Sequence, residues 1–423
     1  MTIMSIGYAC VNPVLPNTGF RKCRKSQVTD VILSELISRN LDALERLIEY
    51  NISKNIKLFR IGSDLIPFAS DPINTLDWKS EYRERFRAIG NKIVSSGMRV
   101  SMHPGQYTVL NSHDEKVYTN SVLDLEYHCS VLDLLETGPE NKIVLHIGGA
   151  YGDKKSAIQT FGKAFKTLDR SIRNRLVIEN DDRIFNIEEV LEIGNELSIP
   201  VVFDNLHNSI NPSQTHMSEH EWMIRCSHTW LGNDGVQKIH YSQQDKNKRP
   251  GAHSERIDIK EFMGFISSFK DNVPDIMLEV KDKNLSTVKC ILSTAEGRNR
   301  QIRNLEEEWS LYKYKILELS AQSYKSIREL LKLKREYPVT EFYDLIDKSL
   351  ELPLDPMNAR NAALHVWGYF KDKAQDKEKI KFFRSLNDYC DGKIKTPTYK
   401  TLLYDLAVKY QQEYLVKSYY FFI

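Results

Sequence analysis

Six short apolar segments of the chain end in histidine, aspartate or glutamate. They read RVSMH at residues 99–103, KIVLH at 142–146, LVIE at 176–179, VVFD at 201–204, KIH at 238–240 and IMLE at 276–279. Continuous apolar runs of this length are typical of parallel strands buried on both faces, and each terminal side chain can bind a divalent metal ion. The pattern therefore predicts a sheet that gathers ligand groups along one edge.

Segments with helical spacing separate these runs from one another and from two earlier runs. The earlier runs are residues 3–9 and 57–62, and helices are predicted at residues 30–50, 77–96, 117–136, 155–173, 187–196, 218–229 and 258–268. Eight strands alternating with helices fit an α/β fold, the (β/α)8 TIM barrel, whose sites lie at the carboxyl ends of the strands. A doubly wound open sheet is the alternative, but such a sheet concentrates its site at one switch point.

Composition fits a reduced, water-soluble enzyme. The chain has 423 residues, a net charge of only +2, and six cysteines without a CxxC pair, which argues against a structural zinc site or a disulfide framework. No basic leader precedes a long apolar stretch, and no apolar run approaches the roughly 18 residues of a membrane span. We expect a cytoplasmic protein without a membrane partner.

Candidate metal ligands are frequent at the predicted strand ends. By chance about one of the 11 histidines would fall there, but three do, and two more lie in the loops just beyond. For a single position, a structural role and a ligand role are about equally expected. The full set comprises His103, His146, Glu179, Asp204, His207, His240, His253 and Glu279.

This mixture of imidazole and carboxylate suits manganese, zinc or iron better than magnesium or calcium, which prefer oxygen ligands. Eight ligands exceed the needs of one ion, so two or three ions are expected. Such clusters hydrolyse phosphoesters by activating water and holding phosphoryl oxygens. The same barrel with fewer ligands could isomerise a sugar, so the ligand count leaves the substrate open.

Several motifs together resemble the UV-damage endonuclease family. They are SIGYACVN at residues 5–12, RIGSDLIPFAS at 60–70, SMHPGQYTVLNS at 101–112, LHIGGAYGDK at 145–154, IENDD at 178–182, FDNLHN at 203–208, KIHYSQQ at 238–244 and AHS at 252–254. The resemblance covers a barrel domain at residues 1–300, and no ligand of the set is missing.

The resemblance implies a DNA-repair endonuclease that acts as a single chain, so a monomer is expected. It would cleave UV-damaged double-stranded DNA on the 5′ side of cyclobutane dimers and 6-4 photoproducts, leaving a 3′-hydroxyl. Mn²⁺ is the usual metal, with Zn²⁺ or another transition metal as the alternative. The protein would associate with the nucleoid when bound to DNA. The barrel is also similar to that of endonuclease IV, so an abasic-site endonuclease remains an alternative.

Carried over by order, the resemblance implies three ion positions: His103 and His146 with a bridging Glu179, then Asp204, His240 and Glu279, then His207 with His253. Lys238 lies two residues before His240, so in a strand both side chains point to the same face. Without the resemblance, a salt-bridge role for this lysine is equally expected. With it, Lys238 approaches the metal site and is carboxylated in some members.

Damage recognition needs groups that can enter a disrupted base stack. Gln106 and Tyr107 follow His103 in a Pro-Gly turn, and the resemblance implies that they probe the lesion. It also implies that Tyr8 and Asn12 line the pocket for damaged nucleotides. Basic runs at residues 246–249 (KNKR) and 300–303 (RQIR) are candidates for the DNA-facing rim, although charge runs are usually solvated.

Residues 301–423 form a predicted all-helical C-terminal extension. Helical spacing covers residues 303–334, Pro338 interrupts it, and short amphipathic helices follow from about residue 358. Residues 365–420 resemble a small uncharacterised helical family. Its aromatic and basic residues could bind a DNA strand, but their spacing favours core aromatics with solvated cations: Tyr369, Phe370, Lys371, Phe382, Phe383 and Arg384.

Two other functions compete with the endonuclease. A metal-dependent sugar isomerase or epimerase would need one or two ions and an enclosed pocket. A damage-binding module that recruits other repair factors would have no use for a complete ligand set.

Overall fold

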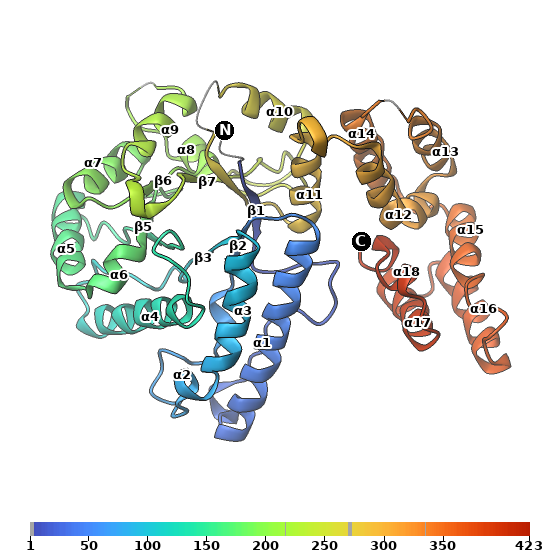
Figure 1. Ribbon diagram of the computed structural model, residues 1–423, viewed down its shortest axis with the longest axis horizontal. Helices are drawn as coiled ribbons and strands as arrows, with labels where there is room; N and C mark the ends of the chain where they lie inside the picture. The colour runs from blue at the N-terminus through green and yellow to red at the C-terminus, as the bar shows by residue number, and fades with distance from the viewer. Residues whose placement is uncertain (1–3, 216, 270–272, 335) are drawn as a thin grey trace. The chain divides into compact units, whose positions relative to one another are not determined.

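The computed structural model describes residues 4–215, 217–269, 273–334 and 336–423. The chain forms two compact units, Met1–Val288 and Lys289–Ile423, so the division falls before residue 300 and within a helix. The first unit holds eight strands and the second is helical (Figure 1).

The eight strands of the first unit are parallel and follow one another around a TIM barrel. Their hydrogen-bonded order is β6-β5-β4-β3-β2-β1-β8-β7. Their bounds are β1 Ile6–Ala9, β2 Leu58–Ile61, β3 Arg99–Met102, β4 Ile143–His146, β5 Leu176–Glu179, β6 Val201–Val202, β7 Lys238–Tyr241 and β8 Asp275–Leu278. The predicted fold is therefore confirmed; of the first predicted strand, Ile3 lies outside the described residues.

The seam between β6 and β7 is closed by a single parallel bridge among the described residues. It pairs Asp204 with His240, and the His240 amide donates to the Phe203 carbonyl at 3.0 Å. Because β6 has only two residues, side chains satisfy part of its backbone: the Thr229 hydroxyl accepts from the Val201 amide, and the Trp230 indole donates to the Val201 carbonyl. The barrel thus closes at two of the predicted ligands.

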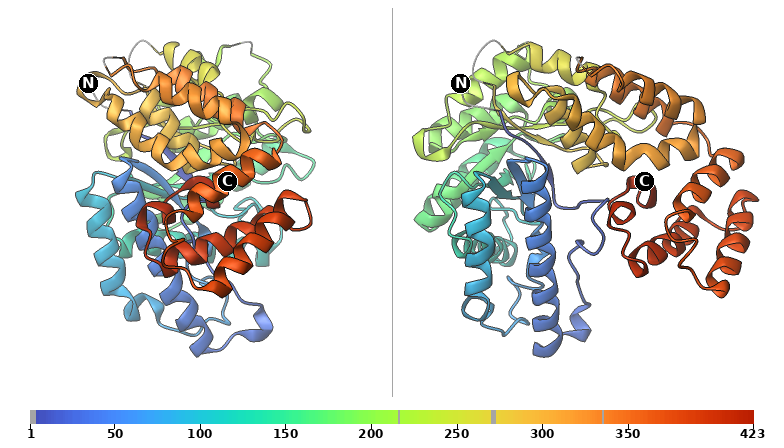
Figure 2. Two further views of the ribbon diagram at one scale, coloured as in Figure 1. Left: turned by 90° about the vertical axis from the view of Figure 1, so that its right-hand side faces the viewer. Right: turned by 45° about the vertical axis from the view of Figure 1, so that its right-hand side comes forward.

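Helices cover the outside of the barrel, and α1 and α3 lie side by side there (Figure 2). Their apolar faces are buried, as in the α1 residues Leu33, Ile37 and Leu44. The helices are α1 Asp30–Ser53, α2 Trp78–Glu81, α3 Arg83–Ser95, α4 Glu115–Leu134, α5 Lys154–Thr167, α6 Arg170–Arg175, α7 Ile187–Leu197, α8 Asn205–Ile210, α9 Glu219–Ser227, α10 Ile259–Ser267 and α11 Asn284–Ser293. No described helix is long and apolar enough to cross a membrane.

Two predicted helices are each two helices in the structure. The segment 77–96 breaks at Tyr82, and the segment 155–173 breaks at Leu168, whose backbone is extended. Helices α8 and α11 lie outside the predicted set. Helix α8 begins directly after the predicted ligand Asp204, and α11 begins five residues after Glu279.

The second unit packs its helices around an apolar core. The helices are α12 Ile302–Leu319, α13 Ala321–Leu330, α14 Val339–Leu350, α15 Pro356–Trp367, α16 Asp376–Cys390, α17 Thr396–Lys409 and α18 Glu413–Val416. Phe370 and Phe382 are fully buried in this core, and Phe383 packs against it. These aromatic side chains therefore serve the core and not an open strand-binding surface, whereas Tyr369, Lys371 and Arg384 are exposed.

Candidate metal centre

The predicted ligands come together because parallel strands present their carboxyl ends at one end of the barrel. His103 directly follows β3, His146 and Glu179 end β4 and β5, and Glu279 directly follows β8. His240 lies within β7, where it faces the barrel interior. Five strands thus contribute side chains to one small volume, together with Asp204 just beyond β6.

Glu179 lies at the centre of this volume and is almost completely buried. Its Oε2 is 3.2 Å from His103 Nε2 and 3.7 Å from His146 Nε2. Its Oε1 is 2.6 Å from His240 Nδ1 and 4.0 Å from His207 Nδ1. Four imidazoles therefore surround a single carboxylate.

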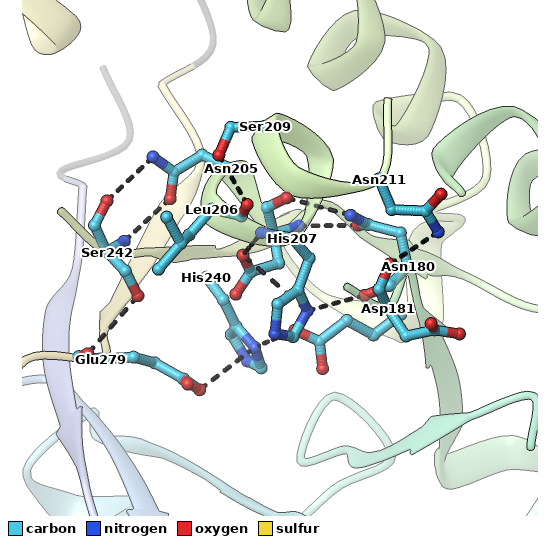
Figure 3. Close-up of polar contacts among 12 residues, drawn as sticks. Asn180, Asp181, Asn205, Leu206, His207, Ser209, Asn211, His240, Ser242 and Glu279 are labelled. Carbon is cyan, nitrogen blue, oxygen red and sulfur yellow. Dashed lines mark hydrogen bonds and ion pairs between the residues drawn. The ribbon is translucent and has the colours of Figure 1, made fainter. Parts of the chain in front are cut away.

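Asp204 and His207 are placed by a helix that begins at the site. The Asp204 side chain caps α8, since its Oδ1 accepts from the His207 amide at 2.8 Å. The Asn180 carbonyl is 2.9 Å from His207 Nδ1, and the Asn180 amide group pairs with the backbone of Asp204 (Figure 3). The cap leaves Asp204 Oδ2 without a hydrogen bond to any residue that the structure describes, so this oxygen can bind a ligand.

Seven of the eight predicted ligands fall into three overlapping groups whose donor atoms lie within 4.8 Å of one another. The groups are His103 with His146 and Glu179, then Glu179 with Asp204 and His207, then Asp204 with His240 and Glu279. Because Glu179 and Asp204 each belong to two groups, either carboxylate could bridge two ions. We refer to these seven residues as the ligand cluster.

His253 is the predicted ligand that these groups leave out. It pairs with Gln244 in an antiparallel bridge in the loop beyond β7. Burial lowers the pKa of His253, against the nearby Glu279 carboxylate, which raises it. His253 thus lies beside the ligand cluster but outside the three compact groups.

Burial and neighbouring charges shift the pKa values of four residues in the ligand cluster. Burial alone would raise the pKa of Glu179, but His240 and His103 hold it well below its usual range. Burial lowers the pKa of His103 to about 4, so this imidazole is neutral. Burial also raises the pKa of Asp204 to about 6. For His207, burial opposes protonation, but Asp204 and Glu179 raise the pKa to about 9.

Several buried nitrogen and oxygen atoms of this site have no hydrogen-bond partner among the described residues, which suits the binding of divalent cations. Among the described residues, Asp204 Oδ2, His146 Nδ1 and His240 Nε2 are buried and have no hydrogen-bond partner. Unpaired buried polar atoms are costly and mark places where a ligand completes the site. Imidazole and carboxylate donors without thiolate suit Mn²⁺, Zn²⁺ or Fe²⁺, so the residues present fit a transition-metal cluster.

Lys238 lies deeper in the barrel than the ligand cluster. Its side chain is 2% exposed, and its Nζ has no hydrogen-bond partner among the described residues. Burial, together with the charges of Arg99 and Arg60, lowers its pKa to about 7. The structural alternative of a salt bridge is thus absent for this lysine, within the described part of the chain.

Arg60 is a site residue that the sequence analysis missed. It lies on β2 and its Nη1 is 2.5 Å from Glu279 Oε1, and both side chains are nearly buried. A cation in a four-residue apolar strand was the signal that could have found it, because buried arginines are usually paired. Asn180, which orients Asp204 and His207, was also missed.

The predicted lesion-recognition residues fall in two different environments. Gln106 and Tyr107 are exposed in the turn after His103, with 69% of Tyr107 accessible. A Cβ at Gly105 would lie 2.4 Å from the Tyr107 ring, so glycine lets the turn fold under that ring. Both side chains are free to contact a substrate.

Tyr8 and Asn12, by contrast, are core residues here. Tyr8 is fully buried, donates to Asn51 of α1 at 2.8 Å and accepts from Asn12 at 3.2 Å. Tyr8 lies on the face of β1 that packs against the helices, because neighbouring strand residues point to opposite sides. In this conformation it does not line an open pocket.

The two basic runs are partly neutralised by neighbouring acids. Lys248 pairs with Asp245 and Glu255, and Arg303 pairs with Glu307. Lys246 is exposed in its loop. The second run belongs to the helical unit, so no position relative to the barrel follows for it.

Comparisons with known proteins identify the families to which the two parts of the chain are similar. The family model described as UV-endonuclease UvdE matches residues 4–307, and the model of a family of unknown function, DUF1722, matches residues 313–423. The chain is 41% identical over 389 residues to the UV DNA damage endonuclease of Clostridium perfringens, covering 91% of this chain and 92% of that protein.

Two further relatives each match about two thirds of the chain. The UV DNA damage endonuclease of Bacillus cereus (strain 03BB102) is 34% identical over 288 residues, which cover 67% of this chain and 90% of that protein. The crystal structure of SacUVDE matches with a TM-score of 0.65 and 36% identity, covering 68% of this chain and 97% of that one. The chain therefore belongs to the UV-endonuclease UvdE family and is a DNA-repair endonuclease with a DUF1722 domain at its C-terminus.

Proposed function

We propose that the enzyme hydrolyses the phosphodiester on the 5′ side of UV photoproducts in duplex DNA and leaves a 3′-hydroxyl. The observation that carries the proposal is the ligand cluster, in which Glu179 and Asp204 are each shared by two ligand groups. Such sharing is suited to two or three ions, with Mn²⁺ as the first candidate. Its substrates would be cyclobutane dimers and 6-4 photoproducts in a cytoplasmic setting, and we propose that it acts as a monomer.

When bound, the ions supply water activation at neutral pH and stabilise charge on the phosphoryl oxygens. Glu179 would hold its two oxygens toward two ion positions, because imidazoles face it on both sides. Asp204 would present Oδ2 while its Oδ1 stays fixed in the α8 cap. The rigid cap and the strand ends thus pre-position the ligands.

His253 would add a further ligand once the third position is filled, as the resemblance implies. It is close enough to Glu279 and His207 for their charges to act on its pKa. Lys238 would remain a near-metal residue, because its unpaired Nζ lies one strand layer below His240.

Lesion recognition would fall to the turn that carries Gln106 and Tyr107. An exposed aromatic ring beside an amide can enter a base stack that damage has already weakened. Extrusion costs less at a damaged pair than at an intact one, which gives selectivity without base reading. Tyr8 and Asn12 would contribute only if binding uncovers them.

The test is cleavage of an end-labelled duplex with one defined cyclobutane dimer, with Mn²⁺ or with a chelator. We expect a Mn²⁺-dependent nick directly 5′ of the dimer, and extension of the nicked strand by a DNA polymerase would verify the 3′-hydroxyl. An undamaged duplex and a duplex with a single abasic site serve as matched substrates. Cleavage of the abasic duplex without any nick at the dimer would replace this proposal with an abasic-site activity.

A further inference from the structure

The ion pair between Arg60 and Glu279 places a cation directly against a predicted metal ligand. Arg60 has one ion pair among the described residues, the contact of Nη1 with Glu279 Oε1 at 2.5 Å. Its Nε is buried and has no hydrogen-bond partner within the described ranges. An arginine fork with free donors is suited to bidentate contact with a carboxylate or a phosphate.

A second cation lies beside this pair. Lys283 is half-buried in the connection between β8 and α11, with a left-handed backbone at φ 53°. It has no ion pair within the described part of the chain. Burial and the charge of Arg60 lower the pKa of Lys283, and the charge of Glu279 raises it. Strands β2 and β8 both pair with β1, so Arg60 on β2 and Lys283 beyond the end of β8, which we call the cation pair, belong to neighbouring parts of the same end of the barrel.

Charge balance shows why the cation pair needs an anion. The ligand cluster contains three carboxylates, from Glu179, Asp204 and Glu279. Two divalent ions would carry four positive charges, and a coordinated Glu279 would share its single negative charge between an ion and Arg60, which has no other ion pair among the described residues. Buried cations left without a partner are strongly unfavourable, so the loaded site has a deficit of negative charge on the side of Arg60 and Lys283.

We propose that the cation pair binds the phosphodiester group that is cleaved, with Arg60 exchanging Glu279 for a non-bridging phosphate oxygen as the ions bind. The ligand class is a phosphodiester of the DNA backbone, since a phosphate supplies a negative charge and the oxygen geometry that guanidinium recognises. The inference rests on the proposed function, because it assigns substrate contacts to that same centre. Arg60 then links ion loading to substrate binding.

The test measures binding and not turnover. Affinity for the dimer duplex is compared with affinity for a duplex carrying a neutral methylphosphonate at the cleaved position, with Ca²⁺ under conditions first shown to give no cleavage. For the wild type we expect the neutral group to weaken binding about tenfold. Arg60→Gln should bind the native duplex about as weakly and lose nothing more on the methylphosphonate duplex.

The salt dependence of binding gives a second readout. Each lost contact between a cation and a phosphate should lower the slope of log K against log salt by about one. Lys283→Gln changes a half-buried loop residue, so it tests phosphate binding by the cation pair even if Arg60→Gln destabilises the folded protein. Arg39→Gln is the matched control, because Arg39 is exposed and pairs only with Glu35 in the described structure.

The outcomes separate the two claims. If Arg60→Gln and Lys283→Gln both keep the wild-type slope and the full methylphosphonate penalty, the phosphate assignment is wrong while lesion cleavage can stand. If the wild type binds dimer and undamaged duplex equally, lesion recognition fails. In that case the salt slopes of Arg60→Gln and Lys283→Gln on the undamaged duplex still support or overturn the phosphate assignment.

Discussion

Each unit of the chain buries a glutamate among polar side chains, and the partners differ. In the barrel, Glu179 faces four imidazoles, and unpartnered donor atoms lie nearby. In the helical unit, Glu318 Oε1 is 2.6 Å from Lys400 Nζ and accepts from the Tyr389 hydroxyl, while Oε2 is 3.3 Å from Lys315 Nζ. One carboxylate is held by groups that can bind metals, and the other by two lysine side chains and a tyrosine hydroxyl.

The difference separates a site from a structural element. Buried charges are tolerated when their own protein pairs them, as in the helical unit. Groups such as Asp204 Oδ2 and His240 Nε2 lack that partner within the described part of the barrel. The unpartnered Asp204 and His240 atoms belong to candidate metal ligands, whereas Glu318 has its partners within the helical unit. Exchanging the two glutamates for neutral residues should therefore affect different properties.

The largest expected effect is on cleavage by the Glu179→Gln variant. Loss of the shared carboxylate should lower single-turnover cleavage of a dimer duplex by about 100- to 1000-fold, while the melting temperature changes little. Glu84→Gln, on the exposed surface of α3, is the control and should cleave at the wild-type rate. Cleavage by Glu179→Gln within a few fold of the wild type would contradict a catalytic role for the cluster.

The next effect concerns stability of the helical unit. Lys400→Ala removes the 2.6 Å partner of Glu318 but leaves Lys315 and the Tyr389 hydroxyl, so the free energy of unfolding should fall by about 1–3 kcal/mol. Guanidinium unfolding followed by circular dichroism measures the change. The double variant Glu318→Leu with Lys400→Met should recover most of it, and a double variant as unstable as Lys400→Ala would show that charge pairing is not the cause.

A smaller effect is expected at the exposed turn of the barrel. Tyr107→Ala should reduce the preference for damaged over undamaged duplex by about tenfold, since stacking on an aromatic ring contributes about 1–3 kcal/mol per base. Competition binding with both duplexes measures this ratio. Tyr151→Ala removes another exposed ring, which stacks on His113, and provides the comparison. A shared loss in both variants would argue against a specific probe.

The smallest effect is a pH dependence at the surface of the helical unit. Lys409 and the Tyr410 hydroxyl lower the pKa of Glu378 to about 2. The folded pKa lies below the unfolded value, so this stabilisation is complete above about pH 5 and is lost as pH falls toward 2. Thermal melts of wild type and Glu378→Gln should differ by well under 1 kcal/mol at pH 6 and converge near pH 2. A difference that persists at pH 2 would assign the effect to packing.

Much of the fold could be predicted from the sequence because its signals are local and repeated. Apolar runs such as IVLH and LVIE define β4 and β5, and parallel strands must present their carboxyl ends together. The convergence of His146 and Glu179 followed from that rule alone. Their grouping around shared carboxylates required the three-dimensional arrangement.

The less predictable parts depend on contacts between distant segments. Arg60 meets Glu279 across 219 positions of sequence, and no local pattern reveals that pairing. Tyr8 points to the outer face of β1, where its hydroxyl donates a hydrogen bond to Asn51 of α1. The helix α8 escaped prediction because its six residues are shorter than a clear helical repeat.

The single bridge that joins β6 to β7 among the described residues affects how readily the barrel opens locally. Its two residues, Asp204 and His240, also belong to one group of candidate metal ligands, so an ion bound there would hold the seam closed. By mass action, ligand binding adds to the free energy of local opening. The His240 amide, bonded to the Phe203 carbonyl, should then exchange its hydrogen more slowly as ion concentration rises. The exchange rate of this one backbone amide would therefore report how much of the site is occupied by metal.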